Sequence, residues 1–486
     1  MRSANLLQNP FCVSLFAAAL LVPGMVLVQT KALGQTKPAA PARGPLRVHP
    51  DNPRYFTDGS GKAVYLTGAH TWNNLVDMGP SDPPERFDFD AYVDFLDRHG
   101  HNFIRLWAWD SVTWDTRANR ESTKNVVNNV APQPWARTGP SKALDGKPQF
   151  DLAKFNEAYF QRLRERVKAA GDRGIYVSVM LFEGWGLMHA NRGRAAPAGW
   201  AWRGHPFHPE NNASGVNADP DGDGQNIQVH SLANPAVTAV QEAYIRKVVD
   251  TINDLDNVLY EVINEGGEEK WDWWVVKTIR EYERTKPKQH PIGLTGHGAE
   301  RLDRMLASPA DWISPGSRDG YRDDPRAWND KQKISLLDTD HVWGLGGNPA
   351  WAWKAFTRGH NPLFMDPYDN SILAKGPADD WKPLRQSLGV TCNLANRVNL
   401  AAMQPHDELA STKFCLAEPG AQYIVYLPGG GEVTIDLSAT KDQFDAEWIH
   451  PIDGTTTPAD PVPGGAKRTL KSPLTGPAVL FLRKST

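Results

Sequence analysis

Short apolar runs alternate with segments of helical spacing along most of the chain. The apolar runs are typical of buried strands and cover residues 63–69, 101–109, 175–182, 257–266, 291–295, 311–314, 333–341 and 362–366. Segments with apolar residues three and four positions apart cover 87–96, 151–167, 234–255, 271–284, 300–306, 350–358 and 381–400. The alternation predicts an α/β fold, a closed (β/α)8 TIM barrel, with 311–314 as its weakest strand. We expect Asp151 to cap the second helix.

The pattern changes at three other places in the chain. Residues 110–149 and 187–232 have no periodicity and are expected to be irregular insertions at the active-site end of the barrel. After residue 400, short alternating runs with turn residues between them predict an antiparallel β-sandwich. These runs cover 423–427, 433–437, 446–450 and 479–482. We therefore assign residues 45–405 to the barrel and 411–486 to the sandwich.

The amino terminus has the features of a signal peptide, predicted over residues 1–34. Arg2 precedes an apolar run at 11–28, and the segment Ala32-Leu33-Gly34 supplies small residues, Ala32 and Gly34, suited to cleavage. Residues 35–44 are expected to be a flexible leader. No later stretch approaches the roughly 20 apolar residues of a membrane span. The sequence thus predicts a secreted or periplasmic protein without a membrane span.

The charge and the cysteine content of the chain bear on nucleic-acid binding, disulfides and metal sites. The formal net charge is −3, which gives no basic field for nucleic acid. After signal removal two cysteines remain, Cys392 and Cys415. They are expected either to form a disulfide or to be buried free thiols. A metal site at these cysteines is not expected, because the chain has no Cys-x-x-Cys motif. The sequence does not indicate an oligomeric state.

The apolar run at 257–266 ends in the pair Asn264-Glu265. With a period of two, Leu259, Glu261 and Glu265 share one face, which points inward in a parallel barrel. A carboxylate there, next to a carboxamide, suits the general acid of glycoside hydrolysis. The structural alternative is a strand end closed by a salt bridge or a helix cap.

A second carboxyl group is needed, and the run at 333–341 offers two. Asp338 and Asp340 lie on the same face as the preceding apolar residues, so either is a candidate nucleophile. We favour Asp338 because it directly follows the apolar run, and expect Asp340 to bind a sugar hydroxyl or water. Glu261 is expected to be a buried partner of Arg105, since an unpaired interior carboxylate is costly.

The other candidates are polar or aromatic residues near strand exits. They are His70, Trp72, Arg105, Trp107, Trp109, Glu183, Trp185, Asn264, His297, His341, Trp343, Asp366 and Tyr368. The tryptophans suggest sugar platforms, although about half are expected to be packing residues. Glu183 is expected to bind substrate or to pair with an arginine. The histidines suggest a polar sugar pocket rather than zinc, because no closely spaced His pair accompanies them.

One acidic segment resembles the start of a calcium loop. Asp219, Asp221 and Asp223 precede Gly224, but His230 stands where such a loop carries its glutamate. The sequence leaves open a structural calcium or a solvated acidic loop. No other cofactor is predicted.

Together, Asn264-Glu265, the carboxylate at the seventh strand and Arg105 in the second resemble the clan of retaining barrel glycosidases that includes cellulases and mannanases. The resemblance implies that Glu265 is the acid/base, that Asn264 holds the sugar 2-hydroxyl and that the strand-seven carboxylate is the nucleophile. The clan carries Glu at the seventh strand, where this chain has Asp.

The two-domain layout is similar to that of apiosidase-like proteins with a C-terminal collagen-binding-like module. The segments LTGAHTWNN and FCLAEPGAQYIVYLPGGG carry this resemblance. Those proteins place Asp on the fourth strand and Glu on the seventh, the reverse of this chain, so the resemblance does not imply a shared substrate.

The predicted function is hydrolysis of a glycosidic bond in a plant or algal polysaccharide or glycoside. The main alternative is an inactive carbohydrate- or matrix-binding protein, which the Asp on the seventh strand keeps open. A peptidase acting on collagen is disfavoured, because the chain lacks HExxH and GxSxG motifs.

Overall fold

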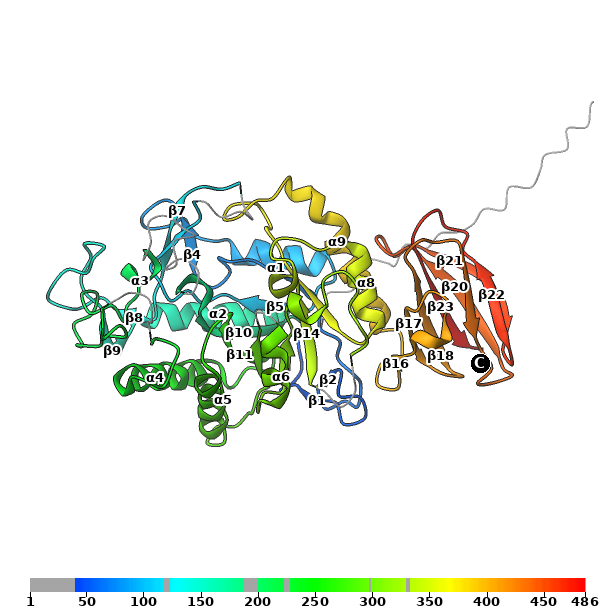
Figure 1. Cartoon of the computed structure of the whole chain (residues 1–486), viewed down its shortest axis with the longest axis horizontal. Helices are drawn as coiled ribbons and strands as arrows, with labels where there is room; N and C mark the ends of the chain where they lie inside the picture. Colours follow the sequence, from blue (N-terminus) through cyan, green and yellow to red (C-terminus); the bar gives the residue numbers. More distant parts are fainter. Residues whose placement is uncertain are drawn as a thin grey trace, which may run out of the picture.

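A computed structural model describes residues 40–117, 123–187, 200–222, 228–296, 299–328 and 333–485 (Figure 1). The predicted signal peptide lies outside these residues. No helix in the described part of the chain is long and apolar enough to cross a membrane.

Eight parallel strands form the predicted barrel. They are β3 (Gly68–His70), β5 (Phe103–Leu106), β10 (Tyr176–Glu183), β11 (Val258–Asn264), β12 (Ile292–Thr295), β13 (Trp312–Ser314), β14 (Ile334–Asp338) and β15 (Asn361–Met365). They are ordered β3-β15-β14-β13-β12-β11-β10-β5, so neighbours in sequence are neighbours in the sheet. At the seam, Asn102 N donates to Thr67 O at 3.0 Å. A Cβ on Gly68 would lie 2.1 Å from Phe103 O, so only glycine lets β3 approach β5 this closely.

Helices cover the outside of the barrel. They are α1 (Phe89–Arg98), α2 (Glu157–Asp172), α4 (Pro235–Ile252), α5 (Glu269–Glu283), α6 (Ala299–Ala307), α8 (Pro349–Thr357) and α9 (Lys382–Ala395). The side chain of Asn234 caps α4 by accepting from Ala236 N and Val237 N. The prediction that Asp151 caps a helix is wrong. Asp151 begins strand β9 (Asp151–Phe155), which pairs with β8 (Trp135–Ala136), and α2 starts after Asn156.

The first insertion is structured, contrary to prediction. Its strands β6 (Thr113–Asp115) and β7 (Val127–Ala131) join β4 (Asp77–Gly79) in an antiparallel sheet of order β4-β7-β6. Strands of three to five residues are too short to show a clear alternation, which is why the pattern gave no signal. The described part of the second insertion contains the short helix α3 (Trp200–Arg203). In Figure 1 these elements lie at the end of the barrel opposite the sandwich.

The barrel interior is filled in layers. The lower layer is apolar and contains Phe103, Tyr176, Leu259, Trp312, Ile334, Leu336 and Leu363. Leu46 and Phe56 belong to the same cluster, so the hairpin of β1 (Arg47–Val48) and β2 (Phe56–Thr57) closes this end. Arg105 and Glu261 follow on the same strands as a buried charged pair. The barrel therefore changes from apolar to ionic toward the carboxyl ends of its strands.

The C-terminal domain is the predicted antiparallel sandwich. One sheet has the order β16-β17-β18-β23-β20-β21, and β19 pairs with β22. These strands are β16 (Gln404–Pro405), β17 (Cys415–Glu418), β18 (Gln422–Leu427), β19 (Glu432–Asp436), β20 (Gln443–Ile449), β21 (Thr456–Pro463), β22 (Lys467–Lys471) and β23 (Ala478–Lys484). Prolines hid β21 from the sequence pattern. It tolerates them because it is an edge strand, where backbone donors need no partner.

An apolar interface joins the sandwich to α8 and α9 (Figure 1). Trp353 is fully buried there, stacks on Tyr426 with ring centroids 6.0 Å apart, and donates from Nε1 to Pro451 O at 2.7 Å. Cys392 and Cys415 are buried free thiols, so they do not form the disulfide considered as one alternative.

We predict that Trp353→Ala lowers the free energy of unfolding by about 3–5 kcal/mol, because it empties a buried aromatic site. The exposed Trp273→Ala is the matched control and should change it by less than about 0.5 kcal/mol. Chemical denaturation measures both. Equal losses in the two variants would show that the interface does not hold the domains together.

Candidate active site

Arg105 is the centre of a buried ionic network at the carboxyl ends of the strands. Its Nε donates to Glu261 Oε2 at 2.9 Å and its Nη2 donates to Glu261 Oε1 at 2.5 Å. Nη2 also donates to Asn264 Oδ1 at 2.8 Å, and Nη1 donates to Asp338 and Asp340 at 3.0 Å each. The predicted Arg105–Glu261 pair is confirmed. Arg105, which the sequence offered as a candidate for binding substrate, holds these four side chains in place.

Asp338 is the last residue of β14 and is completely buried. Its Oδ2 faces His70 Nε2 at 2.7 Å and Arg105 Nη1 at 3.0 Å, while its Oδ1 accepts from Asp340 N at 3.0 Å. Burial by itself would raise the pKa of Asp338, but the charges of His70 and Arg105 outweigh it and hold this pKa well below its usual range. Both oxygens of Asp338 are therefore engaged within the protein.

The chain turns into a short helix directly after Asp338. The expectation of a strand through His341 is wrong, because the Asp338 side chain caps α7 (Thr339–Val342) and ends the strand. Asp340 therefore does not lie one pleat further along β14. The helical turn instead brings its carboxyl group beside Glu265.

Glu265, Asp340 and His341 form the cluster at the mouth of the barrel. One polar atom from each lies within 4.8 Å of the others. Burial and the charge of Glu265 raise the pKa of Asp340 well above its usual range, and Arg105 opposes this shift. Two carboxyl groups this close resist simultaneous ionisation, so the pair tends to hold one proton.

The backbone at the end of β11 is unusual. The strand ends at Asn264, and Glu265 has a left-handed φ of 48°, which is rare for a residue with a long side chain. Asn264 Oδ1 faces His341 Nε2 at 3.2 Å, and His341 Nδ1 faces Ser314 Oγ at 2.8 Å. Such strain concentrates at functional sites.

The tryptophans divide into packed and partly exposed groups. Trp72, Trp107 and Trp109 are at most 5% exposed and pack within the core, as expected for about half of the set. Trp107 Nε1 donates to His70 Nδ1 at 2.8 Å and so orients the partner of Asp338. Trp185 and Trp343 are partly exposed.

Glu183 is buried at the end of β10 and accepts from Gly186 N at 3.1 Å. The structure shows no arginine in contact with Glu183 among the described residues, so of the two expectations for Glu183, pairing with an arginine is not found there. Burial and the charge of Asp110 raise the pKa of Glu183 well above its usual range. Asp110 faces His230 Nε2 at 2.9 Å. This pair was not predicted from the sequence, although Asp110 directly follows the strand-exit residue Trp109.

Several other candidates lie away from this cluster. Asp366 binds Arg385 Nε and Nη2 at 2.7 and 2.6 Å, and Tyr368 N donates to Asp366. These two residues tie β15 to α9. His297 and Asp223 lie outside the described residues. Within the described part of the chain, the one group with metal-ligand spacing is Glu265, Asp340 and His341, so Asp219 and Asp221 form no such group there.

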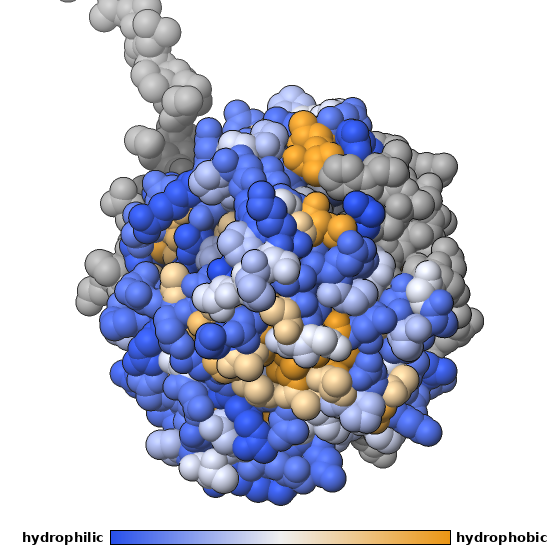
Figure 2. All heavy atoms as spheres, turned by 90° about the vertical axis from the view of Figure 1, so that its left-hand side faces the viewer, coloured by the Kyte–Doolittle hydropathy of each residue, from blue (hydrophilic) through white to orange (hydrophobic). Residues whose placement is uncertain are grey.

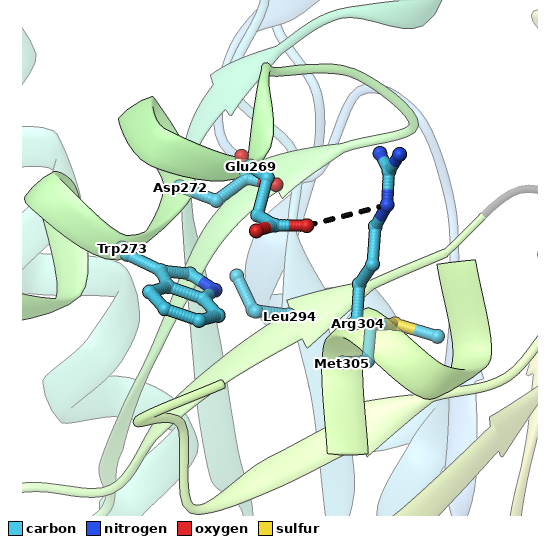
Figure 3. Close-up of a pocket in the computed structure, with 6 residues that line it drawn as sticks. All are labelled: Glu269, Asp272, Trp273, Leu294, Arg304 and Met305. Atoms are coloured by element: carbon cyan, nitrogen blue, oxygen red, sulfur yellow. Dashed lines mark ion pairs between the residues drawn. The ribbon is translucent and has the colours of Figure 1, made fainter. Parts of the chain in front are cut away.

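A separate pocket lies between α5 and α6 (Figure 3). Trp273, Leu294 and Met305 contribute apolar surface, and Glu269 pairs with Arg304 at 3.2 Å. It contains neither Glu265 nor Asp340. Figure 2 shows the end of the molecule that carries the insertions; it is mostly hydrophilic, with apolar side chains gathered below its centre.

Comparison with known proteins supports the fold. The structure resembles a glycoside hydrolase family 5 protein from Bacteroides vulgatus ATCC 8482, with a TM-score of 0.59, 12% identity, and 92% of this chain and 95% of that chain covered. It also resembles a structure named "Glycoside hydrolase", with a TM-score of 0.57, 13% identity, and 91% and 97% coverage. The chain has a glycosidase-like fold.

Comparison of the sequence with known families and curated proteins does not indicate a function. Residues 100–310 match the model of a domain of unknown function, DUF6298. No curated protein matches the chain.

We predict that Asp338→Asn lowers the free energy of unfolding at neutral pH by about 3–5 kcal/mol, because it leaves His70 without its buried anion and removes one of the three carboxylates that contact Arg105. Asp340→Asn should lower the free energy of unfolding by a smaller amount, because it also removes the repulsion between Asp340 and Glu265. The folded-state pKa of Asp338 is depressed, so its contribution is present above about pH 4 and is lost as pH falls. Denaturant titrations at pH 7 and pH 3 should show the Asp338→Asn deficit shrinking at pH 3.

Proposed function

We propose that the protein is a glycoside hydrolase whose reacting carboxyl groups are Glu265 and Asp340. The observation that carries the proposal is the approach of their oxygens to within 4.8 Å at the carboxyl ends of the barrel strands. Retaining glycosidases hold their carboxyl groups about 5–5.5 Å apart, and inverting enzymes about 6.5–9.5 Å apart. The short separation supports a retaining mechanism.

The contacts of each carboxyl group support a division of roles. Arg105 Nη1 donates to Asp340 at 3.0 Å and favours its ionised form, as a nucleophile requires. Glu265 then carries the shared proton and is the acid/base. We place the nucleophile on Asp340 rather than on Asp338, the residue favoured from the sequence, because both oxygens of Asp338 are engaged and its side chain is fully buried.

The reaction follows from this placement. Glu265 donates its proton to the leaving glycosidic oxygen while Asp340 attacks the anomeric carbon and forms a glycosyl ester. Glu265 then removes a proton from water as the water attacks the same carbon and releases Asp340. Arg105 and His341 both face Asn264 Oδ1 and leave the Asn264 amide N–H groups to donate to a sugar hydroxyl.

We further propose secretion or export to the periplasm, from the predicted signal peptide, and a plant or algal polysaccharide or glycoside as substrate. No cofactor takes part in the proposed steps. Glu265, Asp340 and His341 also have the spacing of a cation site, which would leave the carboxyl groups unable to react. A carbohydrate-binding protein without activity is the corresponding second candidate.

We predict that Glu265→Gln and Asp340→Asn each lower kcat by at least about 10²- to 10⁴-fold on an unactivated glycoside, with the fold retained. The exposed Asp369→Asn, which also follows a strand end, is the control and should retain activity. A screen of oligosaccharides for reducing-sugar release identifies the substrate. Full turnover by either variant would remove that residue from the reaction.

Azide separates the two roles. With an activated aryl glycoside, azide should rescue Glu265→Gln with retained anomeric configuration, because the glycosyl ester on Asp340 still forms. It should rescue Asp340→Asn with inverted configuration, because azide then attacks the sugar directly. If azide instead gives the inverted product with Glu265→Gln and the retained product with Asp340→Asn, Glu265 is the nucleophile and Asp340 is the acid/base. A gain of activity on adding EDTA would favour the cation site, because removal of the cation frees the carboxyl groups, and activity that EDTA leaves unchanged would exclude such a cation.

The proton shared by the pair predicts a bell-shaped pH profile for kcat/KM. Burial and the like charge raise the pKa at which the pair loses its last proton, so the alkaline limb should lie well above the usual carboxyl range. In Glu265→Gln the like charge is absent, so the pKa of Asp340 should fall. Carbon NMR of labelled carboxyl groups measures this fall, and an unchanged pKa would mean that the two groups do not interact.

A further inference from the structure

A second pocket lies between the barrel strands and the first insertion. Its lining combines indole and aliphatic surface with a few polar groups, and includes Trp109, Asp110, Trp114, Asp115, Glu183 and Leu187. Most of the charges are already balanced. Asp110 faces His230 at 2.9 Å, and Asp115 accepts from Arg117 Nη2 at 2.8 Å.

The pocket is next to the proposed reacting pair. Glu183 is opposite Asn264 where β10 pairs with β11. One residue further on, a Cβ built on Gly184 would lie 2.7 Å from Gly266 Cα, and Gly266 directly follows Glu265. The charge of Glu265 also acts on Glu183, so a sugar held at Glu265 would lie near this pocket.

Two groups in the pocket are suited to one small polar ligand group. Trp114 is 4% exposed and stacks on Trp109 at 4.6 Å, and among the described residues its Nε1 has no hydrogen-bond partner. Glu183 is 2% exposed, and the backbone N–H of Gly186 donates to both of its carboxylate oxygens at 3.1 Å each. A buried donor without a partner is rare in folded proteins and calls for an acceptor.

We propose that this pocket takes the exocyclic hydroxymethyl group of a hexopyranosyl unit bound at Glu265 and Asp340. A hydroxyl both accepts and donates, so it accepts from Trp114 Nε1 and donates to a Glu183 oxygen. Its methylene group meets the indole surface. A pentopyranose has no group to place there, and a uronate would bring its negative charge beside Asp110 and Glu183. The inference rests on the proposed function and specifies its substrate class.

Matched aryl glycosides test the inference, because each pair differs only by the hydroxymethyl group. The 4-nitrophenyl pairs are β-D-glucopyranoside with β-D-xylopyranoside, β-D-galactopyranoside with α-L-arabinopyranoside, and β-D-mannopyranoside with β-D-lyxopyranoside. We expect kcat/KM for the hexoside to exceed that for its pentoside about 10- to 100-fold in the pair whose ring configuration fits. A preference for the pentoside overturns the inference.

Variants assign the preference to this pocket. Trp114→Phe and Glu183→Gln should each lower hexoside kcat/KM about tenfold while pentoside kcat/KM changes less than about twofold. Trp135→Phe is the matched control, because Trp135 is also a buried tryptophan whose Nε1 has no hydrogen-bond partner among the described residues, and it does not line the pocket. Equal losses on both substrates would indicate a structural effect and contradict the proposal.

Binding separates a failure of this inference from a failure of the proposed reaction. Tryptophan fluorescence of the Glu265→Gln protein is titrated with the six corresponding methyl glycosides, so no turnover is needed. Tighter binding of a methyl hexoside than of its pentoside, lost in a Glu265→Gln/Trp114→Phe double variant, supports the pocket even if the wild-type protein hydrolyses nothing. Equal binding, or no binding by any of the six, overturns it.

Discussion

The buried charge of Arg105 determines the arrangement of the barrel mouth. A guanidinium group away from water is costly unless its donors are matched by acceptors. Here Glu261 and Asn264 on β11, together with Asp338 and Asp340 around the end of β14, accept from it. Arg105 itself comes from β5, so one side chain ties three strands together. The position of Asp340 beside Glu265 depends on this shared contact.

The sequence predicted the features that follow from regular periodicity. The eight strands, the inward face of β11 and the Arg105–Glu261 pair follow from a side-chain period of two and from the cost of a lone interior charge. The two strands were therefore located correctly, but both end earlier than expected, β5 at Leu106 and β11 at Asn264. Whether Glu265 reacts depends on chemistry that periodicity does not describe.

The errors arose where side chains bond to the backbone and end an element. Asp338 accepts from Asp340 N, so the strand stops and the next carboxyl group is carried by a helical turn rather than by a pleat. Asp151 was expected to cap a helix, but the pairing of β9 with β8 extends that segment instead. The short strands of the first insertion depend on partners far away in sequence. In each case a local or long-range hydrogen bond outweighed a pattern that reports only burial.

The charges in the barrel mouth explain how a proton remains at the reacting pair. Glu261 and Asp338 already contact Arg105, and His70 adds a second partner for Asp338. Asp340 shares the same guanidinium group and also faces Glu265, so the carboxyl groups outnumber the cations that contact them. Burial prevents water from compensating for this excess. The least costly way to reduce it is to keep a proton on Asp340 or Glu265, because Asp338 is held ionised by its contacts. The network that anchors the strands thus also supplies the acid that glycoside hydrolysis requires.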